Sequence, residues 1–183
     1  ALPICPALVL GLGGFVAGPG GVAARLAGVP LVIHEQNAIA GLTNRSLAPL
    51  ARRVLAAFPT AFRGGRALVT GNPVRRDIAA LAAPAQRFAD RQGPARLFVF
   101  GGSQGAAALN RLLPAALGSL PIECRPQVLH QAGRGAERVA AVREAYAAAG
   151  IVADVREFVD DMAAEYAAAD LVVCRAGALT VAE

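Results

Sequence analysis

Short runs of hydrophobic residues alternate with longer, Ala-rich segments along most of the chain. The runs predict buried strands at 7–10, 30–35, 53–58, 67–71, 96–100, 127–131, 154–158 and 171–174. The segments between them predict helices over 21–26, 42–51, 104–117, 136–149 and 161–168, and one that starts near 178. Such alternation is typical of parallel strands joined by crossover helices. The sequence therefore predicts an α/β fold.

The alternation is interrupted once, over residues 73–95, where prolines and charged residues accumulate. We interpret this segment as an interdomain connector between a first domain, residues 1–72, and a second domain, residues 96–183. Each predicted domain contains a glycine cluster between a strand and a helix: VLGLGGFVAGPGG in the first and FVFGGSQGAAALN in the second. Two Rossmann-like halves would produce this repeated arrangement.

The second glycine cluster has the composition of an anion site. A strand end, a glycine turn and a helix start bring unpaired backbone N–H groups together, and the helix dipole adds partial positive charge. Ser103 can add a hydroxyl hydrogen bond, and glycine lets the anion approach the main chain. Phosphate, sulfate, carboxylate and a purely structural turn all remain open at this point. The spacing of Gly101, Gly102 and Gly105 is not GxGxxG, which disfavours an NAD enzyme.

Polar residues also follow other predicted strands, where ligands of open α/β sheets bind. They include His34, Glu35 and Asn37 after one strand, Arg75 after another, and Glu183 in the last helix. Each has a structural alternative. His34 could be a hydrogen-bonded buried histidine, Glu35 a carboxylate at a helix start, and Asn37 part of an Asx turn. Arg75 and Glu183 could be solvated surface charges. Asp160 and Asp161 are predicted to start a helix.

Charge and cysteine content exclude several classes of function. The formal charge is +5, and every basic residue is Arg, so a Walker lysine and a Schiff-base lysine are excluded. No basic run or aromatic-interleaved patch indicates nucleic acid. Cys5, Cys124 and Cys174 are too far apart for a zinc motif, and His130 has no paired ligand nearby, so no metal site is predicted. Cys174 is expected to be a buried, inert thiol.

Several segments resemble one family in order and spacing: GGFVAGPGG, HEQNAIAGLTN, AFP, GNPVR, GGSQGA and EFVDDMAAEYAAADLVVCRAGALTVAE. Over almost the whole chain they are similar to the MurG family of peptidoglycan N-acetylglucosaminyltransferases. The resemblance implies a GT-B fold, with parallel sheets of two Rossmann-like domains facing across a cleft and both domains incomplete in this chain. It implies inverting transfer of N-acetylglucosamine from UDP-N-acetylglucosamine to the C4 hydroxyl of lipid I, giving lipid II, without cofactor or metal. The expected location is the cytoplasmic face of the bacterial inner membrane, against an anionic surface.

The resemblance also implies the site residues. Those expected at UDP-N-acetylglucosamine are Asn37, Arg75, Ser103, Val159, Ala178, Leu179, Thr180, Val181, Ala182 and Glu183. The phosphate loop comprises Gly101, Gly102, Gln104 and Gly105, and the acceptor-side loop comprises Gly13, Gly14 and Gly18. The family's acceptor-side histidine is expected before residue 1, and its sugar-binding glutamines after Glu183. Residues 1–183 alone are therefore expected to be inactive.

Other classes remain as alternatives. Another GT-B enzyme, such as a glycolipid synthase or a UDP-sugar epimerase, would share the fold but not HEQN and GALTVAE. A non-catalytic nucleotide-binding module would keep the glycine loop without transferring a sugar. An NAD-dependent oxidoreductase ranks last because of the glycine spacing.

Overall fold

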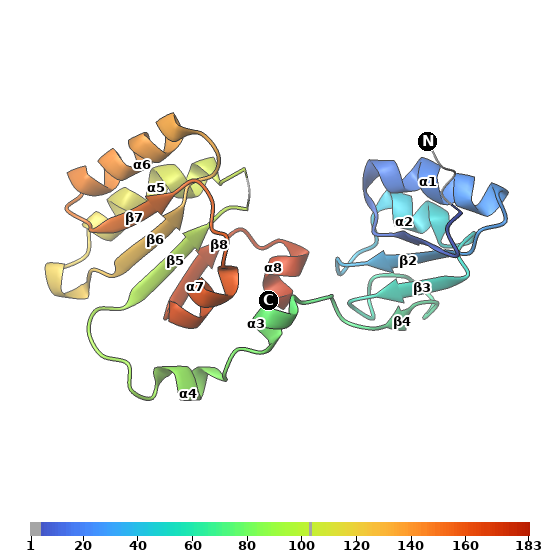
Figure 1. The fold of residues 1–183 in the computed structure, drawn as a ribbon, viewed down its shortest axis with the longest axis horizontal. Coiled ribbons are helices and arrows are strands. Elements are labelled where there is room, and N and C mark those ends of the chain that lie inside the picture. Colours follow the sequence, from blue (N-terminus) through green and yellow to red (C-terminus); the bar gives the residue numbers. More distant parts are fainter. Residues whose placement is uncertain (1–4, 103) are drawn as a thin grey trace. The chain divides into compact units, whose positions relative to one another are not determined.

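The computed structural model describes residues 5–102 and 104–183. It divides the chain into a first compact unit that runs to Val74 and a second that begins at Arg75. Each unit contains a parallel sheet covered by helices, so the predicted α/β class is confirmed (Figure 1). Within the described part of the chain, no helix has the length and apolar character needed to cross a membrane.

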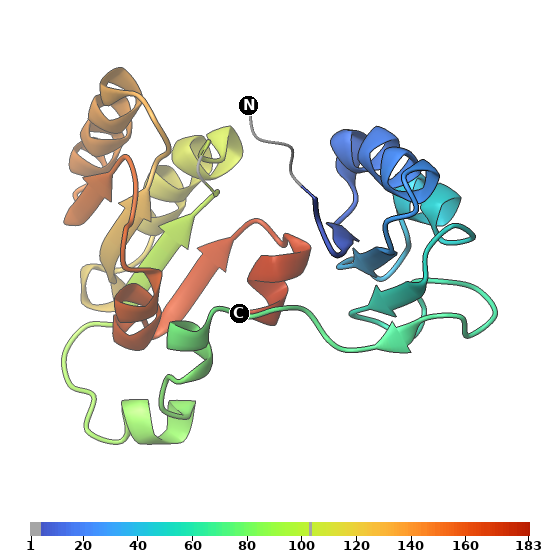
Figure 2. The same cartoon turned by 45° about the vertical axis from the view of Figure 1, so that its right-hand side comes forward.

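The first unit is built on a parallel sheet in the order β1-β2-β3-β4. The strands are β1 (Val9–Gly11), β2 (Leu31–Glu35), β3 (Arg53–Ala56) and β4 (Leu68–Val69). Helices α1 (Gly14–Leu26) and α2 (Leu42–Leu47) lie together over one face of this sheet (Figures 1 and 2). Leu31, Ile33, Leu47 and Val54 form its buried core.

Helix α1 begins seven residues earlier than predicted, at Gly14 rather than Gly21. The prediction treated its glycines and Pro19 as a loop, because both residue types are poor helix formers. Packing overrides that preference. Gly21 and Ala24 are buried, and a Cβ added at Gly21 would lie 2.8 Å from Leu47 Cδ1, so a small residue lets the helix approach α2 closely.

The second unit has a parallel sheet in the order β7-β6-β5-β8. The strands are β5 (Arg96–Phe100), β6 (Gln127–Gln131), β7 (Ala153–Arg156) and β8 (Leu171–Cys174). The helices are α3 (Arg76–Ala79), α4 (Pro84–Phe88), α5 (Ala107–Gly118), α6 (Ala136–Ala148), α7 (Met162–Ala168) and α8 (Ala178–Ala182), with a 3-10 turn at Ile122–Cys124. The bounds of β5, β6 and β8 are those that the hydrophobic runs predicted.

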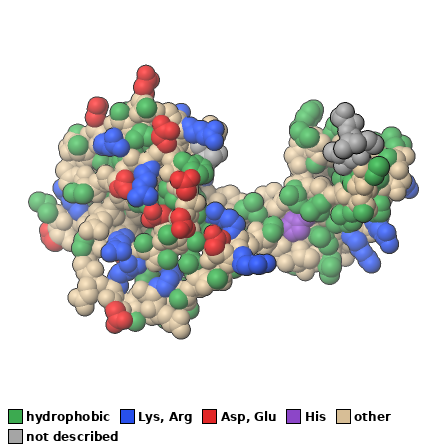
Figure 3. All heavy atoms as spheres, in the orientation of Figure 1, with side chains coloured by type: hydrophobic (Ala, Val, Ile, Leu, Met, Phe, Trp, Pro, Cys, Tyr) green, Lys and Arg blue, Asp and Glu red, His purple; other side chains and the backbone are tan. Residues whose placement is uncertain are grey.

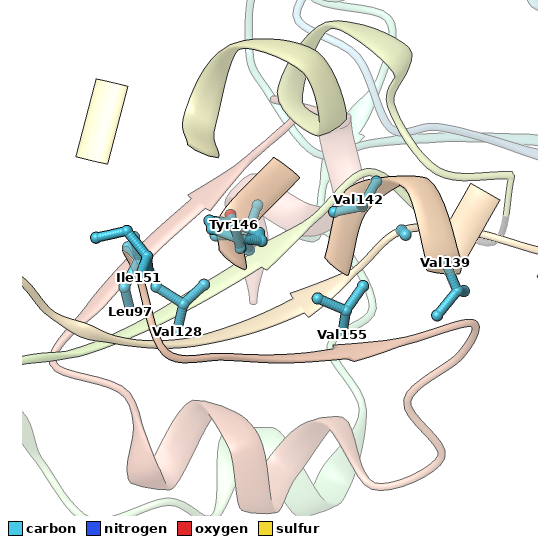
Figure 4. Close-up of a cluster of buried hydrophobic side chains, with 9 residues drawn as sticks. Leu97, Val128, Val139, Val142, Tyr146, Ile151 and Val155 are labelled. Carbon is cyan, nitrogen blue, oxygen red and sulfur yellow. The ribbon is translucent and has the colours of Figure 1, made fainter. Parts of the chain in front are cut away.

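Alternate residues of β5 face opposite sides of this sheet. Leu97 and Val99 pack with the helices α5 and α6, in the cluster that also contains Tyr146 (Figure 4). Phe98 and Phe100 face the other side, where they meet α7. Burial on both faces explains why the strand reads as an unbroken hydrophobic run.

The predicted connector, residues 73–95, contains the short helices α3 and α4. Its arginines attach it to the C-terminal end of α7. Arg87 donates to the Tyr166 carbonyl at 2.8 Å, and Arg91 donates to the Ala168 carbonyl at 2.7 Å. Because the last carbonyls of a helix have no partner within it, arginines there supply hydrogen bonds and favourable charge.

Replacing Gly21 by Val should destabilise the first unit by about 1–3 kcal/mol, because the new methyl groups must enter a filled space beside Leu47. Gly20→Val is the matched control, since a Cβ at Gly20 meets nothing within 4 Å. It should change stability by less than about 0.5 kcal/mol. Chemical denaturation followed by circular dichroism measures both, and equal effects would contradict the packing role of Gly21.

Candidate functional site

The glycine loop of the second unit follows β5 and leads into α5. Gly102 and Gly105 have φ values of 80° and 72°, in the left-handed region that favours glycine. The Gly105 N–H donates to the Gly102 carbonyl at 2.7 Å and closes the turn. Helix α5 begins at Ala107, three residues later than predicted, because these glycines form the turn instead. Ser103, the side chain predicted for the diphosphate, lies outside the described residues.

The loop also needs glycine for lack of space. A Cβ on Gly101 would lie 2.3 Å from the Ala106 nitrogen, and one on Gly105 would lie 2.1 Å from the Ala132 oxygen. Ala132 follows β6, so the loops after two neighbouring strands touch at their main chains. This contact places the glycine loop at the carboxyl edge of the sheet, where open α/β folds bind ligands.

Two arginines that were not singled out in the sequence hold this loop. Arg175, directly after β8, donates through Nη2 to the Gly101 carbonyl. Arg138, in α6, donates through Nη1 to the Gln104 carbonyl at 3.1 Å. Both place positive charge beside the glycine loop, so the arrangement suits an anion. The position of Arg175 after an apolar strand was a signal for this role in the sequence.

The predicted nucleotide residues Arg75 and Glu183 lie against each other. Arg75 Nε donates to Glu183 Oε1 at 2.9 Å and Nη2 donates to Oε2 at 3.4 Å, a two-point ion pair. The hydrogen bond to Glu183 raises the pKa of Arg75. Tyr166 lies 3.5 Å from Glu183 Oε2, and burial raises the pKa of this phenol to about 12. The carboxylate is thus oriented from two sides.

The remaining predicted nucleotide residues follow β7 and β8. Val159 is buried in the cluster of Phe98 and Phe100, and its predicted backbone contact with the uracil stays a prediction. The five residues expected beside the sugar and diphosphate form α8, and Glu183 is its C-cap: Ala178, Leu179, Thr180, Val181 and Ala182. Cys174, at the end of β8, is partly rather than fully buried, and this burial raises the pKa of its thiol.

A pocket of about 340 Å³ lies in the first unit, beyond the ends of β1 and β2. Gly13 and Gly14, from the predicted acceptor-side loop, line it together with Asn37. Gly18 does not line it, because this residue is inside α1, where a Cβ would meet Thr43. The pocket therefore brings Gly13 and Gly14 together with the HEQN segment, a grouping that the sequence analysis did not predict.

Glu35 organises this pocket from beneath. Its side chain is buried, and its carboxylate accepts hydrogen bonds from Asn37 N and Nδ2, Gly41 N and Asn44 Nδ2, at 2.9–3.0 Å. Burial alone would raise the pKa of Glu35, but these hydrogen bonds outweigh it and lower the pKa. A carboxylate so fully engaged is a positioning group for Asn37 and for the start of α2.

Both histidines have structural partners. His34 Nε2 lies 3.0 Å from the Gly71 carbonyl. His130 lies between Tyr146 and Asn110, fully buried. In residues 5–102 and 104–183, no cluster of three or more His, Cys, Asp or Glu side chains has an arrangement that could hold a metal ion.

Comparison with known proteins accounts for both units. Residues 1–56 match the N-terminal domain of glycosyltransferase family 28, and residues 96–183 match its C-terminal domain. The chain belongs to glycosyltransferase family 28. The match to the N-terminal domain contains the pocket beside Gly13 and Gly14, and the match to the C-terminal domain contains the glycine loop.

The family 28 relatives include proteins named UDP-N-acetylglucosamine--N-acetylmuramyl-(pentapeptide) pyrophosphoryl-undecaprenol N-acetylglucosamine transferase. One from Bordetella petrii is 58% identical over 178 residues, and one from an Azoarcus species is 58% identical over 180 residues. The matches cover 97% and 98% of this chain but 49% of each relative. The chain thus spans about half the length of the curated relatives it matches.

Solved structures agree on the fold. MurG of Acinetobacter baumannii is 44% identical, with a TM-score of 0.71 over 96% of this chain and 48% of its own. This similarity confirms the predicted MurG resemblance. A UDP-GlcNAc 2-epimerase from Neisseria meningitidis has a TM-score of 0.60 over 94% of this chain and 54% of its own, at 11% identity. That likeness concerns the fold alone.

Glu35→Gln should lower the free energy of unfolding of the first unit by about 2–3 kcal/mol at pH 7, because an amide N–H₂ would then face several donors. The folded pKa of Glu35 is lowered from 4.5, so its stabilisation is present above pH 4.5 and is lost as pH falls below it.

Denaturation of the original protein and the Glu35→Gln variant from pH 7 to pH 3 measures this effect. The stability gap between the two should narrow as the pH falls below 4.5. Glu144→Gln, on the exposed side of α6, is the control and should leave stability nearly unchanged. A gap that stays constant down to pH 3 would contradict the assignment of an ionised, hydrogen-bonded Glu35.

Proposed function

We propose that this chain is part of an inverting glycosyltransferase that uses UDP-N-acetylglucosamine. The sugar would pass to the C4 hydroxyl of the muramyl sugar of lipid I and give lipid II for peptidoglycan synthesis. The names and the 57–58% identity of the relatives support the substrates. The observation in the molecule that carries the proposal is the glycine loop, flanked by Arg175 and Arg138 at the carboxyl edge of a parallel sheet.

The glycine loop supplies what a diphosphate leaving group requires. Negative charge grows on the oxygen of UDP as its bond to the sugar breaks, and fixed donors in that position lower the barrier. Backbone N–H groups at the start of α5 and the Arg175 guanidinium meet this charge. We propose that they do so without a metal or cofactor.

Arg75 and Glu183 suit the nucleotide. In the proposed complex, the Glu183 carboxylate accepts hydrogen bonds from the ribose hydroxyls. The ion pair with Arg75 orients that carboxylate before the ligand arrives. The exposed guanidinium of Arg75 then retains donors for a phosphate oxygen. The backbone of Val159 would hold the uracil edge.

The reaction requires no group outside the two substrates except a base. The C4 hydroxyl oxygen forms a bond to the anomeric carbon on the face opposite UDP. The bond from that carbon to the diphosphate oxygen breaks, and UDP leaves with the electron pair. The hydroxyl proton passes to the base. Asn37, oriented by Glu35 at the acceptor-side pocket, is proposed to hold a sugar hydroxyl.

Glu183→Ala should weaken UDP-N-acetylglucosamine binding by about tenfold or more, because the ribose would lose charge-assisted hydrogen bonds. Calorimetric titration of the full-length protein that carries this chain measures this, with UDP-glucose and NAD as competing ligands. Lipid II formation from lipid I gives the second readout. Preference for NAD, or unchanged binding by Glu183→Ala, would contradict the site, and a protein that binds the nucleotide without forming lipid II would be a binding module.

We also propose that the protein works at an anionic membrane, at its cytoplasmic face. The whole formal charge of +5 resides in the first unit. Residues 1–74 contain six arginines and a single acidic residue, the buried Glu35, whereas residues 75–183 contain twelve residues of each sign. Figure 3 shows acidic side chains interspersed with arginines over the second unit, while the first unit presents arginines and hydrophobic groups. This asymmetry suits an acceptor carried by an anionic lipid surface.

The full-length protein should bind vesicles containing anionic phospholipid and should be released by salt, because the attraction is screened. Arg52→Gln with Arg53→Gln, two exposed positions of the first unit, should weaken vesicle partitioning by about tenfold. The control pair, Arg134→Gln with Arg111→Gln, lies in the second unit and should have little effect. Co-sedimentation measures both, and equal binding to purely zwitterionic vesicles would contradict the proposal.

A further inference from the structure

We infer that His130 and Asn110 are positioning residues that hold the glycine loop in the shape required for a diphosphate. The inference rests on the proposed function, because it assigns this loop to the diphosphate of a nucleotide-sugar. It concerns a buried network that lies behind the loop and touches no part of the proposed ligand. Neither residue was expected to contribute to the site.

The network begins with the most deeply buried polar group of the second unit. His130, on β6, is 0% exposed. Its Nδ1 lies 2.9 Å from the Tyr146 hydroxyl, on α6, and its Nε2 lies 3.1 Å from Asn110 Oδ1, on α5. Figure 4 shows Tyr146 within the surrounding hydrophobic cluster. The histidine therefore joins a strand to both helices that cover this face of the sheet.

The hydrogen-bond directions in the network follow from Asn110. Its Nδ2 donates to the Ala132 carbonyl at 2.9 Å, so its Oδ1 must face His130 as an acceptor. His130 Nε2 consequently carries the proton, and Nδ1 accepts from the Tyr146 hydroxyl. Burial lowers the pKa of His130 to about 4, which keeps the ring neutral and this pattern intact at physiological pH. Each member leaves its neighbour a single compatible orientation.

The network reaches the glycine loop through the Ala132 carbonyl. Asn110 holds this oxygen, and the same oxygen lies against Gly105, where a Cβ would come within 2.1 Å of it. Gly133, the next residue, also packs closely on the Gly105 nitrogen, because a Cβ there would lie 2.5 Å away. A rotation of the Ala132 peptide would therefore displace Gly105 and the turn that ends at its N–H group.

This arrangement explains why polar groups occupy a position that could be hydrophobic. A leucine in place of Asn110 would fill similar space in the helix interface. It would, however, leave the Ala132 carbonyl free to turn and His130 without its acceptor. Because the loop position depends on that carbonyl, the polar network specifies a precise main-chain geometry rather than merely adding stability.

Asn110→Leu tests the inference by comparing two ligands of the full-length protein, uridine and UDP. Only UDP contacts the glycine loop in the proposed complex. The variant should raise the Kd for UDP by about tenfold, while the Kd for uridine changes by less than about twofold. A residue with a merely structural role would weaken both ligands together or neither. Calorimetric titration measures the two constants.

Tyr146→Phe is the matched control, because it removes one hydrogen bond at the end of the same network that is farther from the loop. It should lower the unfolding midpoint but leave the ratio of the UDP and uridine constants within about twofold of the original protein. If Asn110→Leu does not fold, Asn110→Ser replaces it, and the Kd for UDP should again rise much more than the Kd for uridine.

The outcomes separate the two proposals. The positioning role is supported if Asn110→Leu raises the Kd for UDP much more than the Kd for uridine and Tyr146→Phe does not. If the original protein binds both ligands and the Asn110 variant has the same ratio of UDP and uridine Kd values, the positioning role is overturned. The proposed function is then unaffected. An original protein that binds neither UDP nor UDP-N-acetylglucosamine overturns the proposed function and, with it, this inference.

Discussion

The main-chain contact between Gly105 and the Ala132 carbonyl is the constraint on which the second unit depends. It brings the loops after β5 and β6 together at one edge of the sheet and admits no side chain between them. Arg175 donates to the Gly101 carbonyl and Arg138 donates to the Gln104 carbonyl, so two guanidinium groups lie beside the loop. The proposed diphosphate site is thus a consequence of close backbone packing, with the arginines adding charge.

In the first unit, a buried carboxylate fixes the conformation of the loops around the pocket. The pocket beside Gly13 and Gly14 is shaped by loops, and loops keep a definite conformation only when their backbone groups have partners. Glu35 provides these partners from within, since it accepts from Asn37, Gly41 and Asn44. Each unit therefore carries a buried polar residue behind its site: a charged one in the first unit and the neutral His130 in the second.

The two units differ in the balance of their charges. The second unit balances its arginines with acidic residues and uses individual guanidinium groups for defined contacts, such as the pair of Arg75 with Glu183. The first unit has a single acidic residue, so the charge of its arginines is not balanced within the unit, which is the basis of the proposed contact with an anionic surface. The two proposed substrates, a nucleotide-sugar and a lipid-linked acceptor, would suit these two charge distributions.

The sequence by itself determined the alternation of strands and longer helices, the α/β class and the glycine turn, because hydrophobic periodicity and glycine content act over a few residues. It did not indicate the short helices α3 and α4 in the connector. It also marked Asn37, Arg75 and Glu183 through motifs, and the roles proposed for them remain predictions. Only the tertiary structure decided that α1 starts at Gly14 and that Arg75 meets a residue 108 positions away. It also decided that Arg175 donates to the Gly101 carbonyl and Asn110 to the Ala132 carbonyl. These features depend on which strands become neighbours and how closely helices pack. No local pattern records such contacts, since they arise only when distant segments share one core.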